Sequence, residues 1–453
     1  MKPITHDLAE TIDPVMASIP AAIDKPGEGS EGSTSISTGY RTYVLAVLAM
    51  IGFLCSVDRV VISMFMQPIK QQFGLSDTQL GVMTGLAFAV MGGVVAIPLA
   101  RLADRGSRKW IIGGSLLVWT LLTAATGMAM NFAQLLATRI GVGVGEAGCI
   151  PATHSMLGDY YPREMRARAL AVHTAGTYLG LLGGMVGGGI LVQTVGWRAG
   201  FIWLGFGGLI VSTIFQLTVR EPVRVDEIKQ PHRPSASVIA RLGDLRCFCL
   251  LVGAFSTTAL AGSVVTWLPV YFGRAFVLSP LQIGLGLGLA IGVATAIGAV
   301  LGGQLGNHYS KNSKSWSAGF STLDTIVVMP LFLGTFYAPN PATAFTLLFL
   351  AFAVAGVITG PVFAMLQDLV DPSVRATALA IVALSGVVVG QGFGPVVVGF
   401  LSDHWQSATD GAGGLRRAMT AVATVNFLTI ALFWSLRRRI IAILPPAASG
   451  RGD

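Results

Sequence analysis

Four charged residues lie in two apolar stretches of the sequence, and their types suit proton transfer and anion binding. Asp58 and Arg59 are adjacent in FLCSVDRVVISM, whereas Arg139 and Glu146 are seven residues apart in RIGVGVGEAG. A carboxylate can take up and release a proton, and a guanidinium can hold an anion through two parallel hydrogen bonds. We predict that Asp58 and Glu146 bind a coupling proton and that Arg59 and Arg139 contact an anionic substrate.

Helical spacing limits how these four side chains can pair. A charge at the centre of a membrane helix costs roughly 2.5–3.5 kcal/mol if it faces lipid, so all four must find partners or water. Arg139 and Glu146 fall on one helix face, roughly 10 Å apart, whereas Asp58 and Arg59 differ by about 100° around their helix axis. One arrangement that fits has Asp58 or Arg59 meeting a partner on the helix of Arg139. The alternative is a purely structural network of salt bridges.

Composition decides the class of protein. The chain of 453 residues is 53% hydrophobic and only 11% charged, whereas soluble domains usually carry about 25% charged residues. Apolar segments of about 20 residues, the length that crosses a bilayer as a helix, recur along the chain. The sequence therefore predicts an all-α membrane protein surrounded by the lipid bilayer. Its net charge of +8 fits basic cytoplasmic loops, so we expect no nucleic-acid partner and no metal site.

Hydropathy predicts twelve transmembrane helices in two six-helix bundles. The polar residues 1–40 are expected to be a disordered cytoplasmic tail, followed by a bundle over 41–219. A charged linker over 220–246 leads to a second bundle over 247–441 and a cytoplasmic tail over 442–453. The predicted spans are 43–66, 79–103, 110–130, 132–158, 167–193, 198–219, 247–272, 282–306, 316–338, 342–367, 375–402 and 416–441.

The two halves share a sequence pattern that predicts pseudo-symmetry. MRARALAVHTAG at 165–176 is similar to VRATALAIVALSG at 374–386. Glycines then recur every four residues in both helices, from Gly176 in the fifth and from Gly386 in the eleventh. Such small residues let helices approach closely in lipid. Two related six-helix halves are expected of a parallel repeat about the membrane normal.

The distribution of Lys and Arg predicts that both termini are cytoplasmic. Of the 30 basic residues, 23 fall in segments that this orientation places inside, and Arg59 and Arg139 lie within spans. The predicted outer loops contain the other five: Lys70, Arg198, Arg274, Arg416 and Arg417. We expect a multi-pass protein of a cell membrane, in bacteria the inner membrane, and we expect a monomer.

One loop carries a family resemblance. LARLADRGSRK at 99–109 resembles the loop between helices two and three of the major facilitator superfamily, although Asn307 replaces the corresponding acid in the second half. The resemblance implies the major facilitator fold, and it implies a gating role for Asp104, Arg105 and Arg108. A charged loop that is merely solvated is the alternative.

The charged residues of the first and fourth helices narrow the resemblance. Asp58-Arg59 together with Arg139 and Gly145-Glu146 is similar to the Spinster branch, as are WRAGFIWLG, REP and WLPVYF elsewhere in the chain. Sialin-type organic anion symporters share an Asp-Arg-like pair and a Gly-Glu-Ala run, so they are the nearest competing branch.

Other polar and aromatic residues in the spans are weaker candidates. His173 is a possible proton relay or a core histidine, and the same alternatives apply to His154. Tyr178 and Trp267 are either packing residues or part of the cavity lining, and we include them in the predicted substrate site. Asp324 is the one acid well inside a span of the second half, and its role stays open.

The predicted function is proton-coupled secondary transport by alternating access, with no cofactor beyond the proton. The chain has neither a P-loop nor the HExxH and GxSxG motifs of hydrolases, so we expect no enzyme. Resemblance to Spinster proteins implies an amphiphilic anion such as a lysolipid or a sphingolipid-like molecule. Resemblance to sialin-type carriers implies a small organic acid, and a proton/multidrug antiporter is the third possibility.

Overall fold

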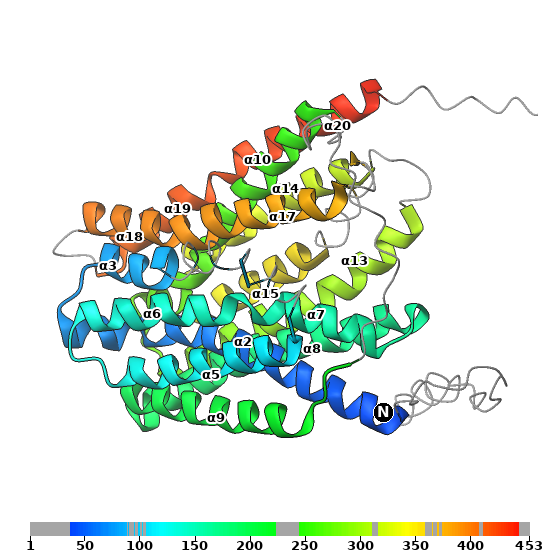
Figure 1. Ribbon diagram of the computed structural model, residues 1–453. Helices are drawn as coiled ribbons and strands as arrows, with labels where there is room; N and C mark the ends of the chain where they lie inside the picture. The colour runs from blue at the N-terminus through cyan, green and yellow to red at the C-terminus, as the bar shows by residue number, and fades with distance from the viewer. Residues whose placement is uncertain are drawn as a thin grey trace, which may run out of the picture. The chain divides into compact units, whose positions relative to one another are not determined.

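The structure is a computed structural model that describes residues 37–87, 106–222, 244–309, 316–357, 374–406 and 411–443, with isolated positions between 88 and 105 and between 358 and 373. Residues 42–453 form one compact unit. The described residues are helices joined by short turns (Figure 1). The predicted division into bundles over 41–219 and 247–441 stays a prediction.

Helices before the predicted linker are long and apolar. α2 is a single helix of 36 residues, and its length exceeds the roughly 20 residues needed to cross a bilayer. The elements of this part are α2 (Thr38–Phe73), α3 (Asp77–Gly81), the π-helix η1 (Val82–Leu86), α5 (Arg108–Gly127), α6 (Phe132–Ala147), α7 (Cys149–Tyr160), α8 (Arg163–Thr194) and α9 (Gly196–Thr218).

Helices after the linker are more often interrupted by 3-10 or π turns. The elements are α10 (Leu245–Gly262), the 3-10 helix η3 (Ser263–Trp267), α11 (Leu268–Ala275), α12 (Pro280–Gly288), the π-helix η4 (Leu289–Ala294), α13 (Thr295–Tyr309), α14 (Trp316–Phe336), α15 (Pro341–Val357), α17 (Arg375–Gly386), the π-helix η6 (Val387–Phe393), α18 (Gly394–Trp405), α19 (Gly413–Ala423) and α20 (Asn426–Ile443).

Nine helices within the described residues are long and apolar enough to cross a membrane, and Pro341–Val357 is a shorter apolar helix. The predicted span 79–103 is described from its start to Ala87, and much of the rest of it lies outside the described residues. The predicted span 132–158 is split at Gly148 into α6 and α7. Pro151 explains the split, because a proline has no N–H to donate to the carbonyl group four residues earlier.

The predicted glycine ridges have the packing role that their spacing indicates. A Cβ added to Gly180 of α8 would lie 2.3 Å from the carbonyl oxygen of Phe53 in α2. A Cβ at Gly390 of η6 would lie 2.5 Å from the Cβ of Ala259 in α10. The fifth predicted span therefore packs on the first as the eleventh packs on the seventh, which agrees with the predicted repeat.

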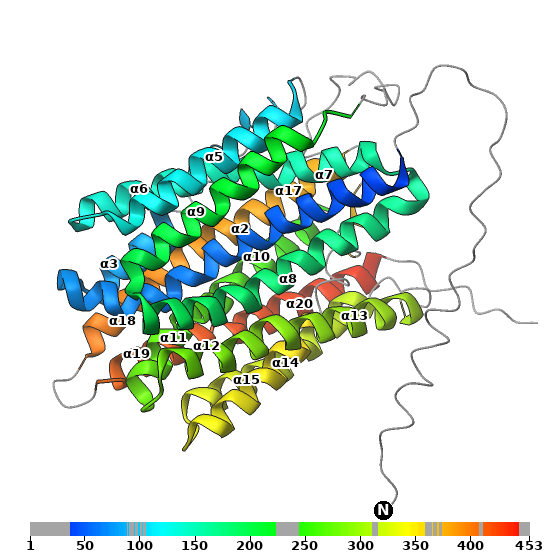
Figure 2. The same cartoon turned by 90° about the horizontal axis from the view of Figure 1, so that it is seen from below.

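Helices from before the linker pack directly against helices from after it. α8 packs against α12 and η4, and α3 packs against α18 (Figure 2). Both contacts need glycine: a Cβ at Gly189 would lie 2.5 Å from the carbonyl oxygen of Pro280, and one at Gly399 would lie 2.3 Å from that of Asp77. A continuous core of buried apolar side chains includes residues of α2, α3, α8, α11, α12, α18 and α19.

Candidate functional site

The four charged residues of the predicted site pair across α2 and α6. The Nε of Arg59 donates to the Oε1 of Glu146 at 2.6 Å, and the Nη2 of Arg139 donates to the Oδ2 of Asp58 at 3.2 Å. Asp58 and Arg59 of α2 are therefore each paired with a residue of opposite charge on α6. The crossed arrangement expected from helical spacing is confirmed.

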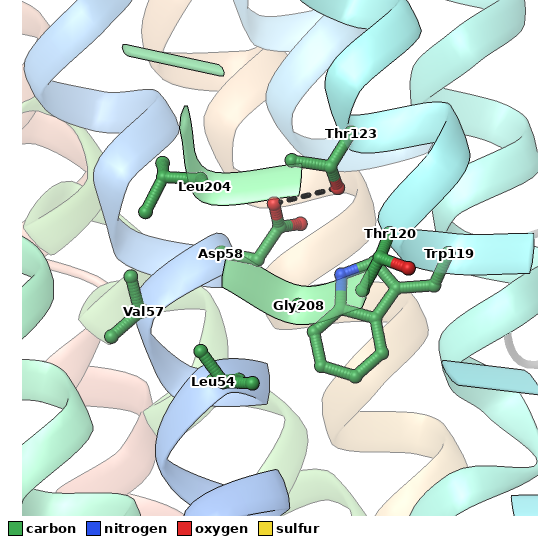
Figure 3. A pocket seen from close by; sticks show the side chains of 8 residues that line it. All are labelled: Leu54, Val57, Asp58, Trp119, Thr120, Thr123, Leu204 and Gly208. Carbon is green, nitrogen blue, oxygen red and sulfur yellow. Dashed lines mark hydrogen bonds between the residues drawn. The ribbon is translucent and has the colours of Figure 1, made fainter. Parts of the chain in front are cut away.

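The geometry of α2 explains why its two adjacent charges have different partners. Cys55 and Arg59 are four residues apart, so they share one face of the helix, and both donate to Glu146. Asp58 points about 100° away. There it also accepts a hydrogen bond from the Oγ1 of Thr123 in α5, at 3.0 Å (Figure 3). One short segment of α2 thus presents a base to Glu146 of α6 and an acid to both Arg139 of α6 and Thr123 of α5.

The two ion pairs differ in exposure. The side chain of Arg59 is 38% exposed, whereas that of its partner Glu146 is 1% exposed. Arg139 and Asp58 are both almost completely buried, at 2% and 5%. Arg59 is therefore the member of the set that a ligand can reach in this conformation, and Arg139 would need a rearrangement to contact one.

A small cavity lies beside Asp58. Its volume is about 20 Å³, enough for roughly one water molecule and far below the several hundred Å³ of a typical ligand pocket. This cavity therefore suits a hydrated carboxylate and not an amphiphilic substrate. Its lining residues, all drawn in Figure 3, are Leu54, Val57, Asp58, Trp119, Thr120, Thr123, Leu204 and Gly208.

Three buried polar atoms of the site have no hydrogen-bond partner among the described residues. They are Nε and Nη1 of Arg139 and Oε2 of Glu146. A buried donor or acceptor without a partner costs about 1–3 kcal/mol. The two oxygens of Glu146 differ, because Oε1 accepts from two donors and Oε2 accepts from no donor among the described residues.

Arg108, predicted as a gating residue, donates hydrogen bonds to α7 and to the residue that follows the end of α9 by three positions. Its guanidinium donates to Asp159 and Ser155 of α7 and, at 3.0 Å, to Glu221, which follows α9. Glu221 also accepts from the backbone amides of Arg108 and Lys109, at 3.2 and 2.7 Å. Burial raises the pKa of Glu221, but these hydrogen bonds outweigh it and lower the pKa below its usual value.

The gating role of Arg108 stays a prediction. Asp104 and Arg105, the other two residues of that prediction, lie outside the described residues.

The predicted aromatic contacts take different positions. Trp267 is completely buried, and its Nε1 donates to the carbonyl oxygen of Pro395 at 3.1 Å, so in this conformation it joins η3 to α18. Tyr178 is half-buried in α8. A substrate contact by Trp267 therefore requires a movement of one of those helices.

His173 and His154 lie together between α8 and α7. Their rings meet edge to face, with centroids 5.3 Å apart. His173 is buried and its Nδ1 lies 3.1 Å from the carbonyl oxygen of Leu48, whereas His154 is exposed. In α14, the Oδ1 of Asp324 is buried without a hydrogen-bond partner among the described residues.

Sequence analysis missed an ionic cluster on the predicted outer side. Asp77, at the start of α3, is fully buried and accepts from Arg274 of α11 at 2.8 and 2.7 Å. It also accepts from Lys70 at 2.5 Å and from Ser402 of α18 at 2.7 Å. Burial raises the pKa of Asp77, but the hydrogen bonds and charge of Arg274 outweigh it and hold the pKa well below its usual range.

The turn between α2 and α3 positions this cluster. Gly74 has a φ of 63°, a left-handed conformation that ends α2, and the amide of Leu75 donates back to the carbonyl oxygen of Lys70. Ser76 then caps α3 in a capping box with Gln79. The Ser76–Gln79 pattern is visible in the sequence, but nothing in the sequence connects this turn to Arg274.

Asp403 of α18 completes the cluster. Its carboxylate accepts from the backbone amides of Asp77 and Thr78, at 2.9 and 2.8 Å. These amides begin α3 and have no partner within that helix, so Asp403 supplies a cap from another helix. Side chains of α11 and α18 thus hold the start of α3 from two sides.

Comparisons with known proteins agree on one family. The sequence profile of the Major Facilitator Superfamily matches residues 48–386. An MFS-type efflux pump of Mycolicibacterium smegmatis is 31% identical over 401 residues, a match that covers 86% of this chain and 91% of the pump. The protein spinster homologue 1 of Bos taurus is 28% identical over 270 residues, which cover 57% of this chain and 50% of that protein.

A solved structure shares the fold. It is that of a bacterial homologue of the human lysosomal transporter Spinster in an inward-facing, unoccupied conformation. Its TM-score is 0.82 at 26% identity, and the match covers 91% of this chain and 100% of that one. The predicted fold class is therefore confirmed. The chain belongs to the major facilitator superfamily, in which it is a Spinster-like, multi-pass membrane transporter and not an enzyme.

Proposed function

We propose that the chain is a proton-coupled secondary transporter that moves an amphiphilic or organic anion. The observation that carries this proposal is the pair of a partly exposed Arg59 and a buried Glu146. While Glu146 is ionised, it occupies the guanidinium. A proton on Glu146 would remove the charge that holds Arg59 there, so that the guanidinium could bind an anionic headgroup through two hydrogen bonds.

Charge balance gives the direction of coupling. Two acids and two bases leave the site neutral when both carboxylates are ionised, and one bound proton makes its net charge about +1. A positive site favours an anion over a cation. Because coupling between two bound species is reciprocal, proton binding and anion binding strengthen each other. Asp58, which is paired with Arg139, is the second candidate proton site.

Alternating access is supported by the contacts on the predicted outer side. The cluster around Asp77 and the apolar core both join helices from the two parts of the chain. The solved Spinster-type structure that resembles this fold is in an inward-facing conformation. We propose that the outer contacts open and close during transport and that both termini are cytoplasmic, in a bacterial inner membrane. We also propose that the transporter acts as a monomer.

The proposed substrate class is supported by the relatives and by the charge of the site. The Spinster resemblance and the exposed Arg59 favour a single-tailed lipid with an anionic headgroup. A second candidate is efflux of small molecules, because one relative that matches most of the chain is an efflux pump. An exporter of cationic drugs would need a negative site instead, so the two candidates predict opposite charge preferences.

A transport assay separates these candidates. Proteoliposomes that contain the full chain would be given either a lysophosphatidic acid or the cation ethidium, with and without an imposed pH gradient. We expect gradient-dependent movement of the lysolipid that is lost in Arg59→Ala. Transport of ethidium but not of the lysolipid would support the efflux alternative. Transport of the lysolipid at the same rate with and without the pH gradient would contradict proton coupling.

A further inference from the structure

We propose that Cys55 is a positioning residue for the proton site: with Arg59 it engages Oε1 of Glu146 and leaves Oε2 as the atom that takes the proton. The inference rests on the proposed role of Glu146. Cys55 is 4% exposed, in the middle of α2.

Two donors converge on one oxygen of Glu146. The thiol of Cys55 and the Nε of Arg59 both donate to Oε1. They are one helical turn apart on the same face of α2, so a single straight segment sets both directions. Oε2 is buried and accepts from no group among the described residues. A proton that reaches this carboxylate finds its free lone pairs on Oε2.

Among the described residues, the titratable groups around Glu146 come from α2, α6 and α7. On α2 they are Arg59, Cys55 and the carboxylate of Asp58, and Cys149 of α7 is also close enough to interact. Arg139, on the same helix as Glu146, is engaged by Asp58. From α5, Trp119 presents its backbone and Cβ at Gly145, with no charge.

The two donors have different tasks. Arg59 is partly exposed, and in the proposed cycle it leaves Glu146 to bind the substrate. Cys55 is buried and neutral, so it can stay on Oε1 throughout. It therefore keeps the carboxyl group oriented when its cation is absent. A hydrogen bond to the ionised carboxylate also favours that form over the protonated one.

Removal and exchange of the thiol have opposite expected effects. Cys55→Ala takes one donor from the ionised carboxylate, so protonation should become easier and its midpoint should move to higher pH. A hydrogen bond to a charged group usually shifts a titration by one or two pH units, and a thiol is a weak donor, so we expect about half to one unit. Cys55→Ser keeps a donor, and a stronger one, so the midpoint should stay or move to lower pH.

Infrared difference spectroscopy of the full chain in lipid nanodiscs can measure these shifts in the protonation midpoint of Glu146 without a substrate. The protonated-carboxyl stretch would be followed against pH in wild type, Glu146→Gln, Cys55→Ala and Cys55→Ser. Cys247→Ala is the matched control, because Cys247 is equally buried but lies in α10, away from the site. The band lost in Glu146→Gln reports the titration of Glu146.

We expect a higher midpoint in Cys55→Ala, a wild-type or lower one in Cys55→Ser, and no change in Cys247→Ala. Equal midpoints in wild type and Cys55→Ala, or the same shift in Cys247→Ala, would overturn the role of Cys55 alone. If Cys55→Ala does not fold, a Cys55→Ser midpoint above that of wild type would overturn it. If Glu146→Gln removes no titrating band, both the proposed proton site and this inference fail.

Discussion

Arg274 donates two hydrogen bonds to the fully buried carboxylate of Asp77, at 2.8 and 2.7 Å, and so joins α11 to α3. The two residues are far apart in the sequence and lie on opposite sides of the predicted linker. A paired arginine and carboxylate give both direction and strength to a contact. A movement that separates α3 from α11 must break this pair, so in the proposed transport cycle the pair opposes opening of the predicted outer side.

Asp77→Asn should shift the transporter towards conformations that are open on the predicted outer side. The substitution leaves Arg274 without its charge partner, and breaking a buried ion pair costs up to about 3–5 kcal/mol. Spin labels at Met130→Cys, at the outer end of the predicted span 110–130, and at Val277→Cys, in a predicted outer loop, would report the separation, because both residues are highly exposed. Exposed Cys249 would be replaced by alanine.

The matched control for this experiment is Asp244→Asn. Asp244, near the end of the predicted linker, pairs with Arg439 of α20 at 2.8 Å and caps α10, so this pair includes no helix from before the linker. We expect longer label distances in Asp77→Asn and unchanged ones in Asp244→Asn. Identical distance distributions in wild type and Asp77→Asn would show that the cluster does not hold this side closed.

Closure of the outer side should not depend on pH in the ordinary range. Because the pKa of Asp77 is lowered, the stability from its ion pair is present above the pKa of an unfolded aspartate, near 4, and is lost only as pH falls through the lowered value. The same spin-label distances measured at pH 7.5 and pH 5.5 should agree. A marked lengthening at pH 5.5 would mean that Asp77, or another outer group, takes up a proton there.

Arg59 and Arg139 should respond differently to alanine. Arg59→Ala is expected to weaken binding of a lysophosphatidic acid at least tenfold and to cost less stability than Arg139→Ala, because the buried Glu146 that it leaves without a cation is the proposed proton site and can become neutral. Arg139→Ala is expected to cost about 3–5 kcal/mol of stability, because it leaves Asp58 buried without a cation. Thermal unfolding and lipid binding, measured on both variants, would separate the effects. Equal stability of the two variants would contradict this division.

Glycine is required at Gly180 and not at Gly187 of the same helix. A Cβ at Gly180 would lie 2.3 Å from the carbonyl oxygen of Phe53, whereas one at Gly187 would meet nothing within 4 Å. Gly180→Ala should therefore destabilise the protein by about 1–3 kcal/mol, as overpacking does. Gly187→Ala should be neutral or slightly stabilising, because alanine is the better helix former. Similar melting temperatures for both variants would refute the close contact of α8 with α2.

Features that depend on local sequence patterns could be predicted, whereas contacts between residues far apart in the sequence could not. The crossed pairing of Asp58 and Arg59 followed from the 100° between neighbours on a helix, and the glycine ridges followed from a period of four. Both are local patterns. The ion pair of Asp77 with Arg274 has no local pattern, since it depends on how α3 meets α11.

Burial was equally hard to predict. In the sequence Arg59 and Arg139 look alike, because both are basic residues within apolar spans. In the structure the side chain of Arg59 is partly exposed and that of Arg139 is buried. Cys55 is similar in this respect, because a thiol in an apolar helix is usually a packing residue. Its hydrogen bond becomes visible only when Glu146 is placed beside it.

The most direct test of the central claim is the affinity for a lysophosphatidic acid as a function of pH, in wild type and in Glu146→Gln. If a proton on Glu146 frees Arg59 for the anion, wild-type affinity should rise as pH falls through the titration of that carboxylate. Glu146→Gln mimics the protonated form, so it should bind the lipid with an affinity that no longer varies with pH. The same slope in both proteins, or a wild-type affinity that rises with pH, would contradict the account.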